Sequence, residues 1–158
     1  MSPDATRAPR RTLIAVCGGA NLNMLGQRDP SQYGTLTLAE LQERVRGYAA
    51  ELDLEVEFFQ SNYEGALIEH LHGLRGRADG IVLNPGAWTH YAWAIRDALE
   101  IAALPTVEVH LSDVKSRESW RRVSVIEELC VMSVCGKGVE GYRLALERLR
   151  EEPGGEGI

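Results

Sequence analysis

The chain has 158 residues, of which 44% are hydrophobic and 25% are charged, and its formal net charge is -6. This length and composition fit a single globular domain that can bury a core without disulfides or metals. The negative net charge argues against a nucleic-acid-binding protein, which needs a basic face, and no apolar run approaches the roughly 18 residues that a membrane span requires.

The termini and the cysteines indicate a protein of a reducing compartment. Residues 1–11 lack the apolar segment of a secretory signal, so we expect a disordered leader there, one domain over residues 12–150 and a flexible tail over 151–158. Cys17, Cys130 and Cys135 are an odd, scattered set, which does not suggest a disulfide framework. We therefore expect three buried free thiols and a cytoplasmic location.

Short apolar runs alternate with amphipathic stretches along the chain. Buried strands are predicted at 12–17, 54–59, 80–84, 106–110 and 130–135. Helical periodicity predicts helices at 38–52, 64–74, 91–103 and 139–150, with a short helix at 116–122. Thr37 and Glu40 form a capping box at the start of the first helix, and the polar segment 18–36 before it is expected to be a long loop.

Strands that alternate with helices predict an α/β fold with a parallel sheet and helices on both of its faces. In such sheets, ligands bind beyond the carboxyl ends of the strands. The residues that directly follow each apolar run are therefore the candidates for a functional site.

Polar and ionisable side chains gather at these strand ends. They are Asn21, Asn23, Arg28 and Tyr33 after the first strand, Gln60 and Asn62 after the second, Asn84 and His90 after the third, and His110, Ser112, Arg117 and Arg121 at or after the fourth. Their joint occurrence at one edge of the sheet predicts a binding or catalytic site.

Each residue taken alone has an ordinary structural explanation. Asn84 precedes a proline, which is a common way to start a turn. Arg28 and Tyr33 could be solvated loop residues. His110 could be a buried histidine whose hydrogen-bond partner is Glu108, because residues two apart on a strand point the same way.

Other chemistries find no support in the sequence. It contains no glycine-rich phosphate loop and no Gly-x-Ser-x-Gly nucleophile elbow. The four histidines and three cysteines do not have metal-ligand spacing. We therefore expect neither a cofactor nor a metal.

Several segments resemble the signature motifs of the type II 3-dehydroquinate dehydratases. Among them are Asn-Leu-Asn-Met-Leu-Gly at 21–26, Asn-Pro-Gly-Ala-Trp-Thr-His at 84–90 and Glu-Val-His-Leu-Ser at 108–112. Matching segments also occur at 28–34, 60–65, 94–98, 117–121 and 136–142, in unbroken order over residues 12–150. The resemblance implies a flavodoxin-like three-layer sandwich with a five-stranded parallel sheet, no cofactor, and trimers that assemble into a homododecamer.

The resemblance also implies an activity, the dehydration of 3-dehydroquinate to 3-dehydroshikimate through an enolate, in the shikimate or quinate pathway. The substrate is a cyclic hydroxy acid. By resemblance the catalytic residues are Tyr33 as base, Arg28 beside it, Asn21 holding a water at the enolate, His110 as acid and Glu108 setting the state of His110. Substrate binding falls to Asn84, Leu111 and Ser112 at the carboxylate, to His90 and Arg121 at the ring hydroxyls, and to Asp97, which would reach a neighbouring subunit's site.

A tyrosine base makes a physical demand on its surroundings. A free tyrosine side chain has a pKa of about 10, so a phenolate near neutral pH needs positive charge close by. Arg28 lies five residues from Tyr33 on a loop that has a glycine at each end, Gly26 and Gly34. Such a segment suits a lid over the site.

Some positions depart from the family motifs. Ala20 stands where the family has proline, Tyr91 and Trp93 follow the Thr-His pair where a small residue is usual, Val125–Glu128 replaces a Ser-Pro-like turn, and Met132 stands near an expected glycine. These changes leave open a paralogue that dehydrates an analogue such as aminodehydroquinate. A catalytically idle flavodoxin-like binding module is a further alternative, although the retained acid and base argue against it.

Overall fold

Five parallel strands form one sheet in the computed structural model of the protein, which describes residues 10–152. They are β1 (Leu13–Gly18), β2 (Glu55–Gln60), β3 (Gly80–Asn84), β4 (Thr106–His110) and β5 (Met132–Cys135), in the order β2-β1-β3-β4-β5. All four pairings are parallel. The predicted five-stranded parallel sheet is confirmed.

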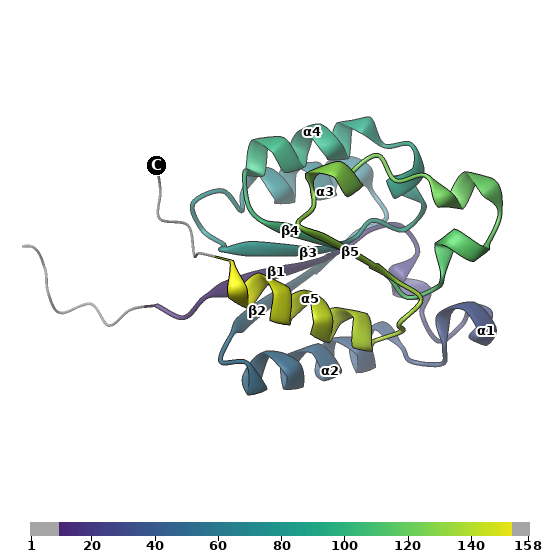
Figure 1. Cartoon of the computed structure of the whole chain (residues 1–158), viewed down its shortest axis with the longest axis horizontal. Coiled ribbons are helices and arrows are strands. Elements are labelled where there is room, and N and C mark those ends of the chain that lie inside the picture. The colour runs from purple at the N-terminus through teal and green to yellow at the C-terminus, as the bar shows by residue number, and fades with distance from the viewer. Residues whose placement is uncertain (1–9, 153–158) are drawn as a thin grey trace, which may run out of the picture.

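Helices cover both faces of this sheet (Figure 1). One face carries α2 (Leu38–Glu51) and α5 (Glu140–Glu151), and the other carries α3 (Glu64–His72) and α4 (Trp93–Ala102). Thr37 caps α2 as predicted, since its hydroxyl accepts from the Glu40 backbone N–H at 3.2 Å. The result is the three-layer sandwich that the alternating pattern predicts.

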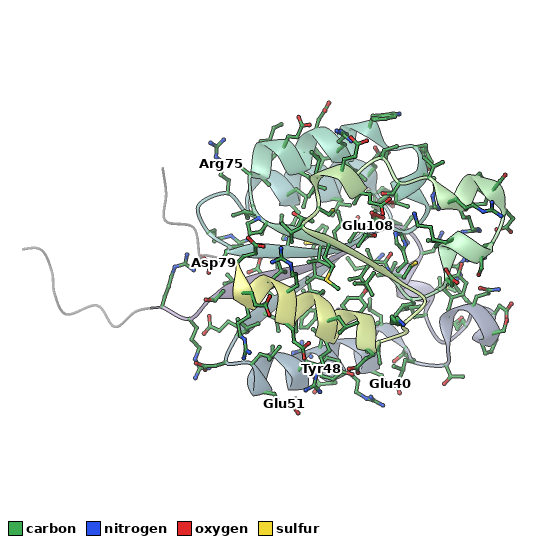
Figure 2. All side chains as sticks on the ribbon, viewed as in Figure 1. Glu40, Tyr48, Glu51, Arg75, Asp79 and Glu108 are labelled. Carbon is green, nitrogen blue, oxygen red and sulfur yellow. The ribbon has the colours of Figure 1, made fainter. Side chains whose placement is uncertain are left out.

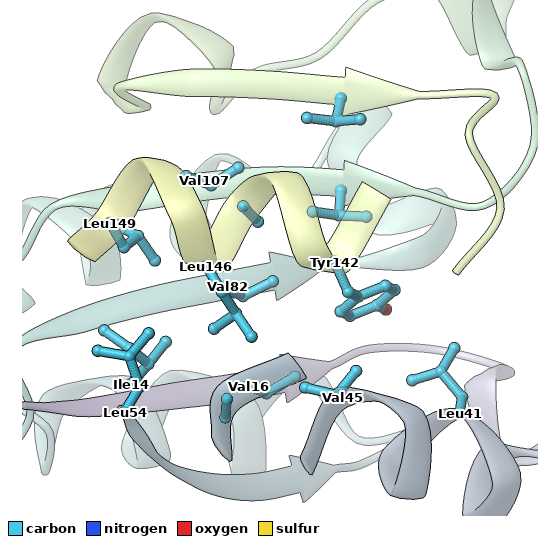
Figure 3. Close-up of a cluster of buried hydrophobic side chains, with 14 of the residues drawn as sticks. Ile14, Val16, Leu41, Val45, Leu54, Val82, Val107, Tyr142, Leu146 and Leu149 are labelled. Carbon is cyan, nitrogen blue, oxygen red and sulfur yellow. The ribbon is translucent and has the colours of Figure 1, made fainter. Parts of the chain in front are cut away.

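The period of two along each strand divides the core between the two faces. On β1, Ile14 and Val16 join the cluster beneath α2 and α5, whereas Ala15 and Cys17 join the cluster beneath α3 and α4. Figure 3 shows the first cluster, in which side chains of α5 pack over those of the central strands. Strands that are apolar on both faces belong in a sheet covered on both sides.

β4 departs from this division on one face. Val107 and Val109 pack into the cluster beneath α2 and α5, but Thr106, Glu108 and His110 on the opposite face are polar and buried. Buried polar groups need hydrogen-bond partners. This face of β4 therefore constrains the segments that cover it.

The predicted long loop 18–36 is partly helical. It contains a 3-10 turn at Leu22–Met24 and the short helix α1 (Pro30–Tyr33). Pro30 opens α1 and Asp29 caps it, accepting from the Ser31 backbone N–H at 2.9 Å. Proline at the first helical position and aspartate before it are local signals for a helix start.

Two predicted helices are shorter or looser than expected. The helix predicted at 91–103 begins only at Trp93, because residues Gly86–His90 form a separate 3-10 turn. The short helix predicted at 116–122 is instead two 3-10 turns, Val114–Ser116 and Ser119–Arg122. Thr89 in the first of these segments donates to Glu108 on β4, and Arg117 in the second donates to Tyr33, so the form of both segments follows tertiary contacts.

Most of the predicted leader and tail lies outside the described residues. At the described edge, the Arg10 guanidinium donates twice to the Asp79 carboxylate, at 2.9 Å each. None of the helices in residues 10–152 has the length and apolar character needed to cross a membrane.

The three cysteines form no disulfide. Cys17 is buried, but Cys130 and Cys135 are only half-buried, so the expectation of three buried thiols is wrong for two of them. Burial raises the pKa of both Cys17 and Cys130 to about 12.

The ends of β1 and β3 meet backbone to backbone, where the chain leaves β1 for one side of the sheet and β3 for the other. Gly19 follows β1, and its backbone N–H donates to the Asn84 carbonyl oxygen at 2.8 Å. A Cβ atom at Gly19 would lie 2.3 Å from the Pro85 carbonyl oxygen. Only glycine permits this approach, which fixes the distance between the loops that follow the two strands.

We expect Gly19→Ala to lower the free energy of unfolding by about 1–3 kcal/mol or more, as overpacking against fixed backbone does. Gly47→Ala is the matched control, because Gly47 lies within α2 and an added Cβ meets nothing within 4 Å. That control should stabilise the protein by about 0.5–1 kcal/mol. Thermal unfolding midpoints at equal protein concentration measure both, and equal midpoints for the two variants would contradict the close approach.

Candidate active site

A cavity of about 150 Å³ opens at the carboxyl ends of β1, β3 and β4. This is the switch point of the sheet, where ligands bind in doubly wound folds. Most of the predicted site residues line it: Asn21, Arg28, Tyr33, Asn84, His90, His110, Leu111, Ser112 and Arg121. The segments that carry them gather at the end of the molecule where α1 lies (Figure 1).

Asn21 holds its place although a proline is absent before it. Its backbone is left-handed, with φ 72°, and its N–H donates to the Asn62 side-chain oxygen at 2.8 Å. The Asn62 amide in turn donates to the Asn23 side-chain oxygen at 3.1 Å. Asn62, from the loop after β2, therefore supports the segment that a proline at position 20 would otherwise stiffen.

Two guanidinium groups face Tyr33. The guanidinium carbon of Arg28 lies 3.8 Å from the centroid of the tyrosine ring. Arg117 donates from Nη1 to the Tyr33 hydroxyl oxygen at 2.7 Å and to Ser112 Oγ at 3.3 Å. Positive charge therefore lies both over the ring and at the hydroxyl of Tyr33.

Arg117 was among the polar residues predicted at the strand ends, but it was assigned no role in the site. It opens the segment 117–121, from which sequence reasoning assigned only Arg121. The motif was thus a usable signal for Arg117. The pairing with Tyr33 was hidden, because 84 residues separate the two in the chain.

Glu108 lies behind the cavity and is 1% exposed. Figure 2 places it inside the fold, whereas Glu40, Glu51 and Arg75 lie at the periphery. Its Oε2 lies 2.7 Å from His110 Nε2, so the predicted pairing on one strand face is confirmed. Two hydroxyls also donate to the carboxylate, Thr89 to Oε2 at 2.6 Å and Ser124 to Oε1 at 2.7 Å.

These partners decide the charge of Glu108. Burial raises the pKa of a carboxyl group, but the bonds from His110, Thr89 and Ser124 outweigh burial and hold the pKa of Glu108 below its usual range. An ionised carboxylate only accepts hydrogen bonds. His110 Nε2 therefore donates to Glu108. His110 also lines the cavity, and its second ring nitrogen, Nδ1, is not used in the bond to Glu108.

His90 and Arg121 form another part of the wall. His90 Nδ1 lies 2.6 Å from the Val123 carbonyl oxygen, so Nδ1 carries a proton and donates it. Burial lowers the pKa of His90 despite this bond, which keeps the ring neutral at pH 7. The ring packs edge-on against Trp120, with 5.2 Å between centroids. Arg121 is oriented by Glu118, whose carboxylate accepts from Nε at 2.7 Å.

Asn84 and Ser112 are buried at the floor of the cavity. The Asn84 side-chain oxygen accepts from the Gly86 backbone N–H at 3.1 Å. Asn84 therefore does form the turn bond that its position before a proline suggests. This bond uses the side-chain oxygen and not the side-chain amide nitrogen, which is a hydrogen-bond donor. Leu111 and Ser112 continue the chain past His110 along the same floor.

Asp97 is not part of this cavity. It is exposed on α4, and neither Tyr91 nor Trp93, each 61% exposed, lines the cavity. The bulky residues that depart from the family motifs thus do not reshape the chain's own site. Within the described part of the chain, no three His, Cys, Asp or Glu side chains are grouped so as to hold a metal ion.

Comparisons with known proteins agree on one family. The family model described as dehydroquinase class II matches residues 12–150. The chain is 51% identical over 141 residues to 3-dehydroquinate dehydratase 2 of Pseudomonas putida, covering 89% of this chain and 95% of the relative. It is 48% identical over 134 residues to the catabolic 3-dehydroquinase of Verticillium alfalfae, covering 85% and 89%.

A solved structure gives the same result. The type II dehydroquinase of Butyrivibrio crossotus superposes with a TM-score of 0.86 at 40% identity, covering 89% of this chain and 99% of that one. The fold and the sequence therefore point to the same relatives.

The lowered pKa of Glu108 predicts a stability that depends on pH. The carboxylate stabilises the fold above the usual glutamate pKa of about 4.3, and this contribution is lost as pH falls through the lower folded-state value. We therefore expect Glu108→Gln to lower the unfolding midpoint most at pH 7, and progressively less below about pH 4. Glu69→Gln, at an exposed site on α3, is the control. A Glu108→Gln deficit that stayed constant over this range would contradict an ionised Glu108.

Proposed function

The chain belongs to the class II dehydroquinase family, and from this premise we propose that it is a hydro-lyase that converts 3-dehydroquinate to 3-dehydroshikimate. The observation that carries the proposal is the pairing of two opposed groups in one cavity. Tyr33 lies beside two guanidinium groups, and His110 is hydrogen-bonded to the buried Glu108 carboxylate, with both side chains lining the same cavity.

The first step is removal of a proton by Tyr33. The phenolate oxygen takes the proton from the carbon next to the ketone, and the electrons of the broken C–H bond form an enolate. Arg28 and Arg117 hold the phenolate before this transfer. Asn21 lines the same cavity, and a water held by its amide would donate to the enolate oxygen.

The second step is loss of the hydroxyl group. As the enolate electrons return, the C–O bond breaks and His110 gives a proton to the departing oxygen, which leaves as water. A carbon–carbon double bond conjugated with the ketone remains. Tyr33 has then gained one proton and His110 has lost one, so a proton must pass from tyrosine to histidine, through solvent, before the next turnover.

The polar floor and wall of the cavity suit a cyclic hydroxy acid. The Asn84 amide, Ser112 and the backbone at Leu111 would bind the substrate carboxylate, and His90 and Arg121 the ring hydroxyls. A chain with a net charge of -6 can attract this anion because arginines concentrate at the cavity. Neither Tyr91 nor Trp93 lines the cavity of its own chain, so the lining of that cavity gives no support to the analogue hypothesis.

We also propose that the protein is a cytoplasmic homo-oligomer, with trimers assembling into a dodecamer. Three free thiols suit a reducing compartment. Trp93 and Asp97 are exposed on α4, and Tyr91 is exposed just before that helix, which supports a subunit contact that would bring Asp97 to a neighbouring cavity.

The proposal is tested by adding 3-dehydroquinate and following the ultraviolet absorbance of the conjugated enone product. We expect turnover by the native protein and a loss of about 10²–10⁴-fold in Tyr33→Phe, the usual effect of removing a general base. Tyr63→Phe is the matched control, because Tyr63 is 79% exposed. No absorbance change with the native protein would refute the function. A Tyr33→Phe variant that kept more than about a tenth of the rate would refute the base.

His110→Ala separates the two steps. Proton removal by Tyr33 comes first, so exchange of the substrate's ring proton with solvent deuterium should survive better than net dehydration. Mass spectrometry of recovered substrate measures the exchange, and the enone absorbance measures dehydration. Equal loss of both rates would mean that His110 assembles the site or tunes Tyr33, and does not simply act as the acid of the second step.

A further inference from the structure

Glu108 receives more hydrogen bonds than its pairing with His110 requires. We propose that Thr89 and Ser124 are positioning residues, which fix the plane of the Glu108 carboxylate and thereby hold His110 in place as the acid. This rests on the proposed function of His110. Neither Thr89 nor Ser124 lines the cavity, so both would act through Glu108 and not by touching the substrate.

The geometry fixes both carboxylate oxygens. His110 and Thr89 share Oε2, at 2.7 and 2.6 Å, while Ser124 Oγ lies 2.7 Å from Oε1 and 3.1 Å from Oε2. The two hydroxyl oxygens are themselves 3.1 Å apart. A carboxylate held only at Oε2 could still rotate about its Cγ–Cδ bond. The bond from Ser124 to Oε1 prevents this rotation and so sets the direction in which Oε2 faces the imidazole.

The surrounding backbone directs the Ser124 proton toward Glu108. Ser124 Oγ accepts hydrogen bonds from the backbone N–H groups of Ile126 at 3.3 Å and Glu127 at 3.1 Å. A hydroxyl has one proton to donate and two lone pairs with which to accept. With its lone pairs occupied by these N–H groups, Ser124 gives its proton to the ionised carboxylate, which is the strongest acceptor nearby.

The segments that carry Thr89 and Ser124 are also bonded to the wall of the cavity that contains His90. Thr89 directly precedes His90, and its carbonyl oxygen accepts from the Val125 N–H at 2.8 Å. His90 in turn bonds to the Val123 carbonyl oxygen at 2.6 Å. The segment on either side of Ser124 is thus bonded to the turn that carries both Thr89 and His90. A displacement of the Glu108 carboxylate would therefore shift both His110 and His90.

Several charged or titratable groups face Glu108 from the elements around it. They are His110 on β4, His90 in the turn 86–90, Cys130 before β5, and Lys115, Arg121, Arg122, Glu127 and Cys135 around the small cavity beside the carboxylate. The bonds from Thr89 and Ser124 lower the pKa of Glu108 against the opposing effect of burial. Loss of either hydroxyl should therefore let Glu108 take up a proton at higher pH, after which it holds His110 less well.

The experiment compares the dependence of kcat on pH for four variants of the full chain. In Ser124→Ala and Thr89→Val, the part of the acid limb that reflects protonation of Glu108 should move to higher pH by about one unit, the size expected when one hydrogen bond to a charged group is lost. The part that reflects the base Tyr33 should stay in place. At neutral pH, kcat should fall about tenfold while KM changes less than about threefold, because the substrate contacts remain. Ser124→Thr keeps the hydroxyl and should restore the native profile. Ser119→Ala, at an exposed serine of the same segment, should match the native protein.

A purely structural role predicts a different result. If kcat fell equally at every pH with no movement of the acid limb, and Ser124→Thr were no better than Ser124→Ala, the proposal would be wrong. Thr89→Val removes a hydroxyl from a different segment, so it still tests the positioning role if Ser124→Ala fails to fold. A native-like limb in Thr89→Val would then overturn the proposal for both residues.

A measurement without substrate separates this proposal from the proposed function. The carbon-13 resonance of the Glu108 carboxyl, assigned with Glu108→Gln, reports its protonation in the folded protein. Its midpoint should move to higher pH in Ser124→Ala and Thr89→Val and return in Ser124→Thr. If the native protein failed to dehydrate 3-dehydroquinate, the proposed function would fall, and unmoved midpoints would still overturn the positioning role independently.

Discussion

A carboxylate buried inside the molecule, at Glu108, dictates much of the structure around the site. A buried charge is costly unless it is paired and hydrogen-bonded, and removing one partner leaves an uncompensated charge. The partners of Glu108 come from β4 itself, from the turn 86–90 and from the segment after residue 122. The need to satisfy one side chain therefore orders two loops that are far apart in the sequence. One of them carries His90 into the cavity wall, and the other directly follows the turn that carries Arg121.

The other half of the site depends on backbone contact at the switch point. Gly19 brings the end of β1 against the loop after β3, and the chain then runs through Asn21 to the short helix that ends at Tyr33. Arg117 reaches Tyr33 from the segment after β4. The proposed base and the proposed acid are thus held by different residues from different segments of the chain. Arginines surround Tyr33 and a buried carboxylate contacts His110, so one small cavity contains two oppositely charged environments.

Local signals in the sequence predicted local structure well. Thr37 and Glu40 correctly indicated the start of α2, and the period of two along β4 correctly paired Glu108 with His110. The 3-10 turns around residues 114–122 were missed because their shape comes from contacts and not from periodicity. The exposure of Cys130 and Cys135 was misjudged for a related reason. Cys130 precedes β5 and Cys135 ends it, and β5 lies at the edge of the sheet, where apolar sequence does not ensure burial.

The sequence by itself determined the parallel α/β architecture, the family motifs and most of the cavity residues, because strand periodicity and strand ends are properties of neighbouring positions. Only the tertiary structure decided which side chains meet. Arg117 finds Tyr33 across 84 residues, and Ser124 and Thr89 find Glu108 from separate loops. Hydrogen-bond partners of this kind are set by how segments pack in three dimensions. No spacing in the chain encodes the few tenths of an ångström on which such bonds depend.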